Sequence, residues 1–376
     1  MFETFDLITL QQYWWIIVSL LAAILVFLMF VQGGQTLLYT VAKTEEERDL
    51  LVNTLGRKWE ITFTTLVTFG GAFFASFPLF YSTSFGGAYW VWMIILFAFI
   101  IQAVSYEYRK KQSNFLGSAT FEWFLFLNGL LATVLIGAAV STFFTGSDFF
   151  IDDYNLSYWM NKTRGLEAAL NVQNLSLGLS VFFLTRITGS MYFMNTIDHE
   201  VIFKRATRQV LINAVLFLVF FLTFVGFLLT QSGFAVNPTT SEVTMEPYKY
   251  LHNFLDMPLV LGLFLIGVVL VLFGIFKAVF KKSDKSFWWT VAGVIPVVLS
   301  LFLIAGFNNT AFYPSTHDLN SSLTIQNASS SHYTLTAMSY VSLFVPVVIL
   351  YIWYAWRKIN NQKITRNELD NNSHVY

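Results

Sequence analysis

The chain has 376 residues, of which 56% are hydrophobic and 12% are charged. Soluble globular proteins carry about 25% charged residues, so this composition leaves too little polar surface for water and indicates an integral membrane protein. The formal net charge is zero, which gives no basic surface for a nucleic acid. The chain contains no cysteine, which excludes disulfides, zinc–thiolate sites, iron–sulfur clusters and thiolate ligation of haem.

The N-terminus lacks the features of a secretory signal peptide. Such a peptide has a basic n-region and a small-residue cleavage site, whereas the residues before Tyr13 include Glu3 and Asp6 and no basic residue. The apolar run 13–31 is long enough to cross a bilayer. We therefore interpret it as the first permanent transmembrane helix.

Apolar runs close to the roughly 20 residues that a membrane-spanning helix needs recur along the whole chain. The expected spans are 13–32, 60–81, 88–107, 122–144, 174–194, 208–230, 257–280, 287–307 and 335–356. The fifth is the weakest, because Arg186 lies inside it and residues such as Asn174 and Thr185 dilute its hydrophobicity. The pattern predicts an all-α integral membrane protein with nine transmembrane helices.

The basic residues test this number of spans. Of the 22 Lys and Arg residues, 18 fall in every second connection between the expected spans. By the positive-inside rule this alternation places the N-terminus outside and the C-terminus in the cytoplasm of a multi-pass membrane protein. Without the fifth span, Lys204, Arg205 and the basic residues after 276 would lie on the wrong side. The charges therefore support a helix that hydrophobicity alone leaves doubtful.

The connections differ in length and polarity. The first loop, 43–49, mixes both charge signs and is interpreted as a solvated helical turn. The long outer loops 145–173 and 231–256 are expected to cap the bundle or contact a partner. The last outer segment, 308–334, is rich in Ser, Asn and Thr, whose side chains can satisfy helix ends.

No complete active site is visible in the sequence. All histidines fall in loops or in the C-terminal tail: His199, His252, His317, His332 and His374. Haem in a membrane bundle is usually held by imidazole or methionine ligands inside the helices. Metal-ligand spacings, nucleophile elbows, phosphate loops and dinucleotide fingerprints are all absent from the sequence. We therefore expect no catalytic residue, no metal site and no ligated cofactor in this chain.

Polar and ionisable groups within or beside the spans are the remaining candidates, because such groups are costly in a membrane unless paired or functional. Glu60 begins the second span and is either a carboxylate stabilised by the helix dipole or part of a proton relay. Glu107 ends the third span, where an interfacial ion pair is the simpler interpretation. Glu122 begins the fourth span and could meet either carboxylate at the same level. Gln102 faces a cavity or a neighbouring helix.

Arg186 is the deepest candidate in the chain. It lies about midway along the fifth expected span, where an unpaired guanidinium would be expensive. It therefore needs a carboxylate, carbonyl groups, water or a partner subunit. A purely structural pairing and a role in a buried charge route both remain open at this stage.

Several motifs in a fixed order resemble one known family. The matching segments are Trp14-Trp15, 59–81, Phe85-Gly86-Gly87-Ala88-Tyr89, Tyr106-Glu107-Tyr108-Arg109, Tyr313-Pro314-Ser315, Ser322-Leu323-Thr324, Ala328-Ser329-Ser330-Ser331, Thr334-Leu335, Pro346 and Leu350-Tyr351. Together with nine spans, this combination resembles subunit II of the cytochrome bd-type quinol oxidases over nearly the whole chain. No single segment would be specific.

The resemblance implies a role in respiration in a bacterial cytoplasmic membrane. It implies a partner, subunit I, that carries haems b558, b595 and d and the quinol site, in a complex that oxidises membrane quinol and reduces dioxygen to water. Such an oxidase is electrogenic without pumping protons. For this chain it implies a supporting role, routes for protons or dioxygen, a structural quinone, and a small accessory subunit in the complex.

The resemblance also implies an internal division of the membrane domain. A first four-helix bundle is expected over about 1–145 and a second over 146–310. The outer segment, a peripheral ninth helix and the cytoplasmic tail then occupy 311–376.

The chain departs from the family at charged positions. The family's Asp-Gly-Phe-Asp is Gly33-Gly34-Gln35-Thr36 here, so both carboxylates are missing. A common Arg is Gln102, Trp-Asp-Gly-Asn has become Trp59-Glu60-Ile61-Thr62, and an Asp at the start of the fourth helix is Glu122. The joint loss of Asp, Asp and Arg avoids leaving one buried charge unmatched. The proton route that the family implies is therefore damaged or rebuilt.

Two other classes of protein compete with the oxidase subunit. A secondary transporter or permease would show broken helices in two related halves; Pro78, Pro258, Pro296 and Pro346 could break helices, but the halves do not match. A structural membrane scaffold is the third interpretation. Co-purification with a haem-bearing partner separates the oxidase subunit from both.

Overall fold

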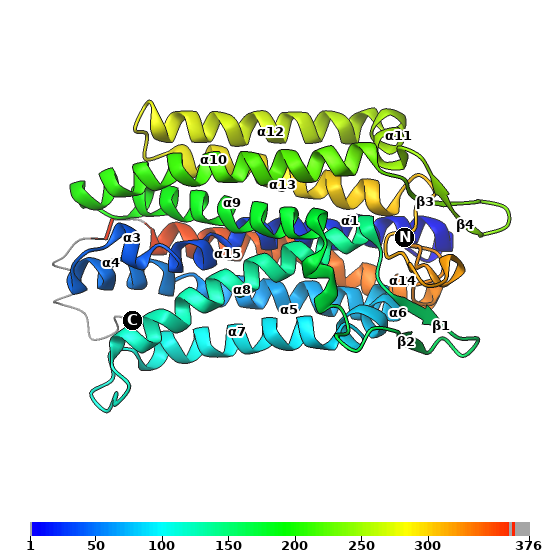
Figure 1. Cartoon of the computed structure of the whole chain (residues 1–376), viewed down its shortest axis with the longest axis horizontal. Helices are drawn as coiled ribbons and strands as arrows, with labels where there is room; N and C mark the ends of the chain where they lie inside the picture. Colours follow the sequence, from blue (N-terminus) through cyan, green and yellow to red (C-terminus); the bar gives the residue numbers. More distant parts are fainter. Residues whose placement is uncertain (1, 361–362, 365–376) are drawn as a thin grey trace.

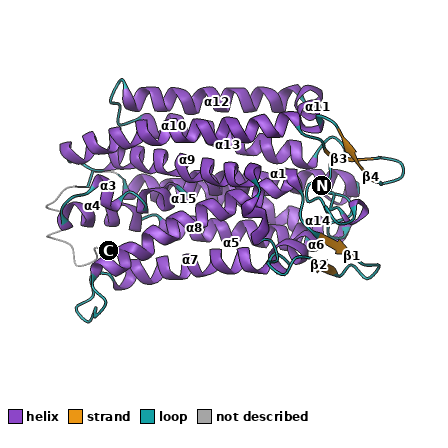
Figure 2. Ribbon diagram, in the orientation of Figure 1, coloured by secondary structure: helices purple, strands orange, loops and turns teal. Residues whose placement is uncertain are grey.

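The computed structural model describes residues 2–360 and 363–364 of the chain. Long helices lie side by side along one direction (Figure 1). One end of this bundle, which we call the hairpin end, carries four short strands, and Figure 2 shows them in orange beyond the helix ends. The opposite end, the basic end, contains α4 (Glu45–Gly56) and the connection 109–117.

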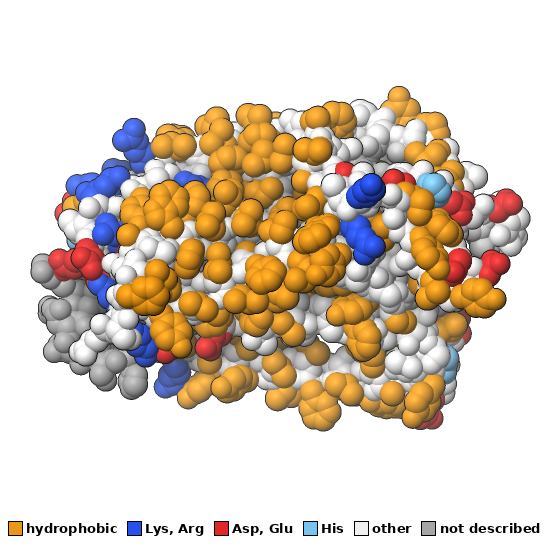
Figure 3. Space-filling model, turned by 60° about the horizontal axis from the view of Figure 1, so that its bottom comes forward, with side chains coloured by type: hydrophobic (Ala, Val, Ile, Leu, Met, Phe, Trp, Pro, Cys, Tyr) orange, Lys and Arg blue, Asp and Glu red, His pale blue; other side chains and the backbone are white. Residues whose placement is uncertain are grey.

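The surface matches a membrane protein. Figure 3 shows hydrophobic side chains covering the middle of one face, with most of the visible Lys and Arg side chains at one end and few at the other. Charges thus leave a broad apolar belt between two polar ends, as a bilayer requires.

Helices account for most of the described chain. The long ones are α1 (Leu7–Leu28), α5 (Trp59–Ser76), α7 (Tyr89–Tyr108), α8 (Ser118–Thr145), α9 (Val172–Thr196), α10 (Glu200–Thr230), α12 (Pro258–Val279), α13 (Ser286–Gly306) and α15 (Val345–Ile359). The shorter ones are η1 (Phe2–Thr4), α2 (Phe30–Gln35), α3 (Leu38–Val41), α4, α6 (Pro78–Phe80), η2 (Tyr81–Gly86), η3 (Leu166–Leu170), α11 (Lys249–Asp256), η4 (Leu319–Ser321) and α14 (His332–Ser342).

The prediction of an all-α membrane protein is confirmed, with eight spanning helices in the described chain and a ninth if one bent pair is a span. That bent pair corrects the second expected span, 60–81. The helix ends at Ser76, and the following segment, Pro78–Gly86, turns away by 118°. A proline disfavours helical backbone in the residue before it, and Phe77 has φ −133° and ψ 65°.

Two other spans contain breaks. The first bends at Met29 between α1 and α2, and the carbonyl of Leu28 accepts a hydrogen bond from Thr62 Oγ1 (3.1 Å). The last expected span, 335–356, consists of α14 and α15, with Leu343 and Phe344 between them. Neighbouring side chains can satisfy backbone groups freed at such breaks, which makes them tolerable in a bilayer.

Two antiparallel hairpins extend the hairpin end. Strands β1 (Phe149–Ile151) and β2 (Ser157–Trp159) pair with Phe149 opposite Trp159. Strands β3 (Gly233–Val236) and β4 (Val243–Glu246) pair with Gly233 opposite Glu246. The long outer loops predicted from the sequence therefore contain ordered hairpins.

Helix α9 lies at the centre of the packing and contacts α2, α8 and α10, while α12 packs on α13 and α7 on α8. Helix α1 packs against both α5 and α13. The two expected four-helix groups, 1–145 and 146–310, thus share long contacts through α8–α9 and α1–α13. Their division into separate bundles stays a prediction.

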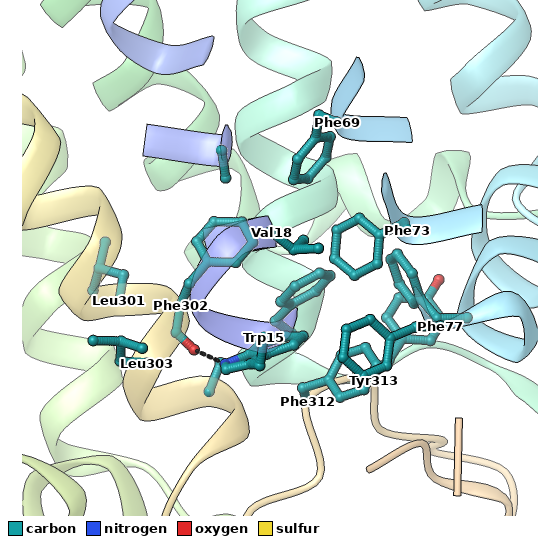
Figure 4. Packing of buried hydrophobic residues seen from close by; sticks show 14 of the residues in the cluster. Trp15, Val18, Phe69, Phe73, Phe77, Leu301, Phe302, Leu303, Phe312 and Tyr313 are labelled. Atoms are coloured by element: carbon teal, nitrogen blue, oxygen red, sulfur yellow. Dashed lines mark hydrogen bonds between the residues drawn. The ribbon is translucent and has the colours of Figure 1, made fainter. Parts of the chain in front are cut away.

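An aromatic core joins the helices near the hairpin end (Figure 4). Trp15 is fully buried, packs against Phe77 and Phe312 at ring-centroid distances of 5.7 and 4.5 Å, and donates from Nε1 to the carbonyl of Phe302 (3.1 Å). Buried indole N–H groups need such an acceptor. The core thereby fixes α1, α5 and α13 relative to the segment that follows α13.

Candidate functional site

A buried charge cluster lies at the basic end, where α3, α4, α7 and α8 meet. Glu122 is 1% exposed, and its Oε1 accepts hydrogen bonds from Arg109 Nη2 (2.7 Å) and Nε (3.1 Å). Its Oε2 accepts from the Tyr39 hydroxyl (2.8 Å) and lies 3.0 Å from Arg48 Nε. Two guanidinium groups and a phenol therefore hold one carboxylate, which balances the desolvation of a buried charge.

The cluster continues toward the surface through Asp49. This carboxylate lies 2.6 Å from Arg109 Nη2 and 2.9 Å from Lys110 Nζ. Burial acts to lower the pKa of Lys110, but its hydrogen bonds to Glu45 and Asp49 raise the pKa above the ordinary value. Burial and the hydrogen bond to Glu122 raise the pKa of Tyr39 to about 12, so the phenol stays a neutral donor at physiological pH.

The first loop supplies part of this cluster, which corrects its interpretation as a solvated turn. Thr44 and Glu47 form a reciprocal capping box that begins α4, as expected for a Thr-x-x-Glu sequence. Glu47 is 8% exposed and pairs with Arg205 Nη1 at 2.7 Å. The loop therefore ties α4 to α10 and directs Arg48 and Asp49 toward α7 and α8.

Gln102 belongs to a second, uncharged group next to this cluster. It lies one turn before Tyr106 on α7, whose hydroxyl accepts a hydrogen bond from Gln35 Nε2 (3.0 Å) on α2. Gln32 lies one turn before Gln35, on the same side of its helix. Because α2 and α7 run in the same direction, the geometry places Gln32 and Gln102 at one level.

Asn128 of α8 completes what we call the amide group. The adjacent Gly129 touches the backbone of Gln32, because a Cβ there would overlap the Gln32 carbonyl oxygen. All four amides are fully buried. Seven of their side-chain atoms have no hydrogen-bond partner: Gln32 Nε2 and Oε1, Gln35 Oε1, Gln102 Nε2 and Oε1, and Asn128 Nδ2 and Oδ1. Buried polar atoms are normally hydrogen-bonded to protein or to water, so this arrangement indicates internal water.

Arg186 is held by neutral groups. Its Nε donates to Asn213 Oδ1 (2.7 Å), and its Nη1 donates to Thr36 Oγ1 (2.8 Å) and to the Thr36 carbonyl (3.1 Å). The guanidinium also lies 5.4 Å from the ring centroid of Phe182. The guanidinium is therefore held by two polar side chains, one backbone carbonyl and an aromatic ring.

The remaining candidates lie apart from both groups. Glu107 is exposed and pairs with Lys111 on the next turn at 3.0 Å. Glu60 is exposed on the first turn of α5. Neither carboxylate lies in the Glu122 cluster, which is formed with Arg48, Asp49 and Arg109 instead.

Four histidines lie within the described residues. His199 caps α10, His252 contacts Glu246 and His317 lies near Asp148. His332 was expected in a loop but is the first residue of α14, where the last candidate span begins, and its Nε2 lies 2.8 Å from the carbonyl oxygen of Phe5. His374 lies outside the described residues. Within residues 2–360 and 363–364, no three His, Asp or Glu side chains gather as a metal site would require.

Sequence reasoning missed the other members of the Glu122 cluster and of the amide group around Gln102. They are Tyr39, Arg48, Asp49 and Arg109 in the cluster, and Gln32, Gln35 and Asn128 in the amide group. Amides at 32, 35, 102 and 128 within apolar runs were a visible signal of a buried polar group. Asp49 lies 60 residues from Arg109, and Tyr39 lies 83 residues from Glu122. Local sequence patterns do not report contacts over such separations.

The arrangement of spans, buried charges and neutral amides can be compared with known proteins. The family model for cytochrome bd terminal oxidase subunit II matches residues 10–359. The chain belongs to this family. The oxidase-subunit interpretation is thus confirmed, and no comparison supports the transporter alternative.

Relatives of this cytochrome bd subunit II span the same length. The chain is 28% identical to cytochrome bd-I ubiquinol oxidase subunit 2 of Escherichia coli (strain K12), covering 98% of this chain and 99% of the relative. It is 26% identical to cytochrome bd ubiquinol oxidase subunit 2 of Bacillus subtilis (strain 168), and the match covers 93% of this chain and 96% of the relative. The match is therefore to whole proteins and not to a shared segment.

A solved structure supports the same fold. The chain superimposes on a chain from the structure of bd oxidase from Geobacillus thermodenitrificans with a TM-score of 0.66, covering 94% of this chain and all of that one. The sequence identity is 13%, so this likeness concerns the fold. The family assignment rests on the sequence matches.

Proposed function

We propose that this chain is the non-haem subunit of a membrane complex that oxidises quinol and reduces dioxygen to water. The observation that carries this proposal is the family match along residues 10–359. In this proposal, the complex is electrogenic without pumping protons, and a haem-bearing subunit I carries haems b558, b595 and d and the quinol site. A structural quinone and a small accessory subunit belong to the proposal as expectations from the family.

The outward face of α5 suits contact with another membrane chain. Its exposed face carries the small or weakly polar Thr64, Thr68 and Gly71 beside the apolar Val67 and Phe74, and small residues of this kind allow close packing of helices in membranes. By contrast, α12 exposes Leu259 and Val269 by 85% and 64%, as expected for a lipid-facing helix. We propose that subunit I packs on α5, with Glu60 at the basic end of that interface.

The charge distribution supports one orientation in the bacterial cytoplasmic membrane. Lys110, Arg109, Arg205 and the basic residues around them lie at the basic end. The positive-inside rule places that end in the cytoplasm. The N-terminus and both hairpins then face outward.

Purification from native membranes tests the proposed function. We expect a tagged chain to co-purify with a haem-bearing membrane partner in a preparation that consumes dioxygen when supplied with quinol. A chain that purifies without haem and without quinol-dependent dioxygen consumption, under conditions that keep the membrane partner soluble, would contradict the proposal.

The buried charge cluster and the amide group suggest a rebuilt proton route through this subunit. Neutral amides do not exchange protons at physiological pH, but they orient water molecules that do. Seven buried amide atoms without a hydrogen-bond partner lie on α2, α7 and α8. The Glu122 cluster extends from there toward the basic end through Asp49. We propose that water held by Gln32, Gln102 and Asn128 carries protons inward from Glu122.

A separate apolar cavity supports the expectation that this subunit holds dioxygen or provides a route for it. It has a volume of about 60 Å³ and lies between α1, α9, α10, α12 and α13, lined by side chains such as Val26, Phe221 and Val298. An engineered apolar cavity of about 150 Å³ stays dry and binds benzene. A cavity this much smaller is too tight for a quinone ring and suits a diatomic gas, so we propose that dioxygen resides there.

A further inference from the structure

A groove with a volume of about 470 Å³ opens at the hairpin end, outside the buried polar groups described above. It is bounded by the last turns of α8 and α10, the first turn of α9 and the β3–β4 hairpin. Three spanning helices begin or end at this level. The groove therefore lies where the headgroups of the adjacent membrane leaflet lie.

One buried donor in the groove has no acceptor. Gln173 is 4% exposed, lines the groove, and its Nε2 has no hydrogen-bond partner. The start of α9 is otherwise satisfied, because Asn171 Oδ1 accepts from the backbone N–H groups of Gln173 and Asn174. Leaving a buried amide donor unpaired is unfavourable, so Gln173 indicates an acceptor that this chain does not supply.

The lining is amphipathic in the sense that a lipid requires. Val172, Phe227 and Met245 line the groove and are 62%, 43% and 48% exposed. The same face of α10, one and two turns before Phe227, carries Thr223 and Phe220, both half-buried, and then the exposed Leu216. Gln231 and Ser232 form its polar rim. This surface is therefore apolar along α10 and offers hydrogen-bonding groups at its rim, at the hairpin end.

The lining contains no charged side chain. A headgroup with net negative charge would normally be matched by Lys or Arg, whereas amide and hydroxyl groups suit a zwitterion. We propose that the groove binds one phospholipid with a zwitterionic headgroup, whose oxygen accepts a hydrogen bond from Gln173 Nε2 while an acyl chain follows α10. This inference requires the hairpin end to lie at a membrane surface, and it does not depend on the oxidase reaction.

Native mass spectrometry of the purified, delipidated complex tests the proposal with dioleoyl phosphatidylethanolamine as the probe. Gln173→Leu removes the donor at similar volume, and Ser232→Trp fills the rim from an exposed position. Leu255→Trp adds the same ring at an exposed site on α11 outside the groove. We expect wild type and Leu255→Trp to retain one lipid that both groove variants bind about tenfold more weakly.

The competing outcomes are distinct. Equal binding by all four proteins would overturn the proposal, as would a stronger and groove-dependent preference for dioleoyl phosphatidylglycerol. A quinone or a segment of another subunit found in the groove would also overturn it. If Gln173→Leu does not assemble, Ser232→Trp decides the question, because its side chain is exposed and takes no part in packing α9.

Discussion

Arg109 and Glu122 are buried together at the end of α7 and the start of α8, with 2.7 Å between Nη2 and Oε1. Each residue is 1% exposed. Arg109 begins the connection 109–117, and Glu122 lies in the first part of α8 just after that connection, so the pair closes it. The pair therefore fixes how α7 and α8 meet. It also places a carboxylate on the side of the amide group that faces the basic end.

Glu122→Gln should destabilise the complex strongly. Removing one partner of a buried ion pair costs about 3–5 kcal/mol, because the remaining charge stays desolvated. Since Asp49 still contacts Arg109, we expect a loss near the lower end of that range. The free energy of unfolding in mixed micelles measures it.

Glu107→Gln is the matched control for that variant. Its pair with Lys111 is exposed and joins adjacent turns of one helix region, and such pairs contribute about 0.3–0.5 kcal/mol. We expect little change in unfolding. Equal losses for the two variants would show that the Glu122 cluster contributes no more than a surface pair.

Gly33→Ala should separate α2 from α9. A Cβ at Gly33 would overlap the carbonyl group of Thr185, and a Cβ at Gly189 would lie 2.6 Å from the backbone nitrogen of Gly34. Overpacking costs about 1–3 kcal/mol, and here the obstacle is backbone, so we expect the upper end of that range. Thermal unfolding of the purified complex measures the loss.

Gly262→Ala provides the comparison for Gly33→Ala. A Cβ at this position of α12 meets no atom within 4 Å, and alanine is about 0.5–1 kcal/mol more favourable than glycine inside a helix. We expect unchanged or slightly higher stability. A loss at Gly262 as large as that at Gly33 would contradict the close-approach explanation.

The sequence predicts the helices better than their ends. Apolar run length and charge alternation are properties of the chain itself, and they correctly indicated α9 despite Arg186. The break at Phe77 was visible in Pro78, because the residue before proline is biased away from helix. The expected span 60–81 ran through it, since apolar residues continue on both sides.

The candidate site was harder to predict for a physical reason. Arg186 was correctly expected to need partners, but its neutral partners Thr36 and Asn213 come from other helices. An arginine in a membrane span suggests a carboxylate as its partner. Here the carbonyl group of Thr36 and the side chains of Thr36 and Asn213 accept its hydrogen bonds instead. Packing of distant segments chooses between these solutions, and one sequence does not contain that information.

Thr36→Asp should create a charge pair with Arg186. The Thr36 hydroxyl lies 2.8 Å from Nη1, so a carboxylate at this position reaches the same group. Hydrogen bonds to charged groups contribute about 1.5–3 kcal/mol. We expect Thr36→Asp to be tolerated alone and strongly destabilising in an Arg186→Leu background. A double-mutant cycle on unfolding measures the coupling, and additive effects would contradict it.

Glu60→Gln should slow quinol-oxidase turnover or change its pH dependence. This carboxylate lies on the exposed first turn of α5, where the proposed subunit I would cover it, and glutamine cannot exchange a proton. The assembled complex with normal haem content is the material to measure. Wild-type turnover at every pH would assign Glu60 to packing at the interface.

Gln102→Leu should lower turnover by removing internal water while preserving side-chain size. Both amide atoms of Gln102 are buried without protein partners, so leucine removes the two groups proposed to hold water without breaking a hydrogen bond within the chain. If proton delivery limits the reaction, a tenfold loss corresponds to about 1.4 kcal/mol on the barrier.

Dioxygen consumption with saturating quinol measures this loss, with haem content confirming assembly. Gln102→Asn keeps an amide and should remain close to wild type, and equal turnover in Gln102→Leu would exclude the amide group from the proton route.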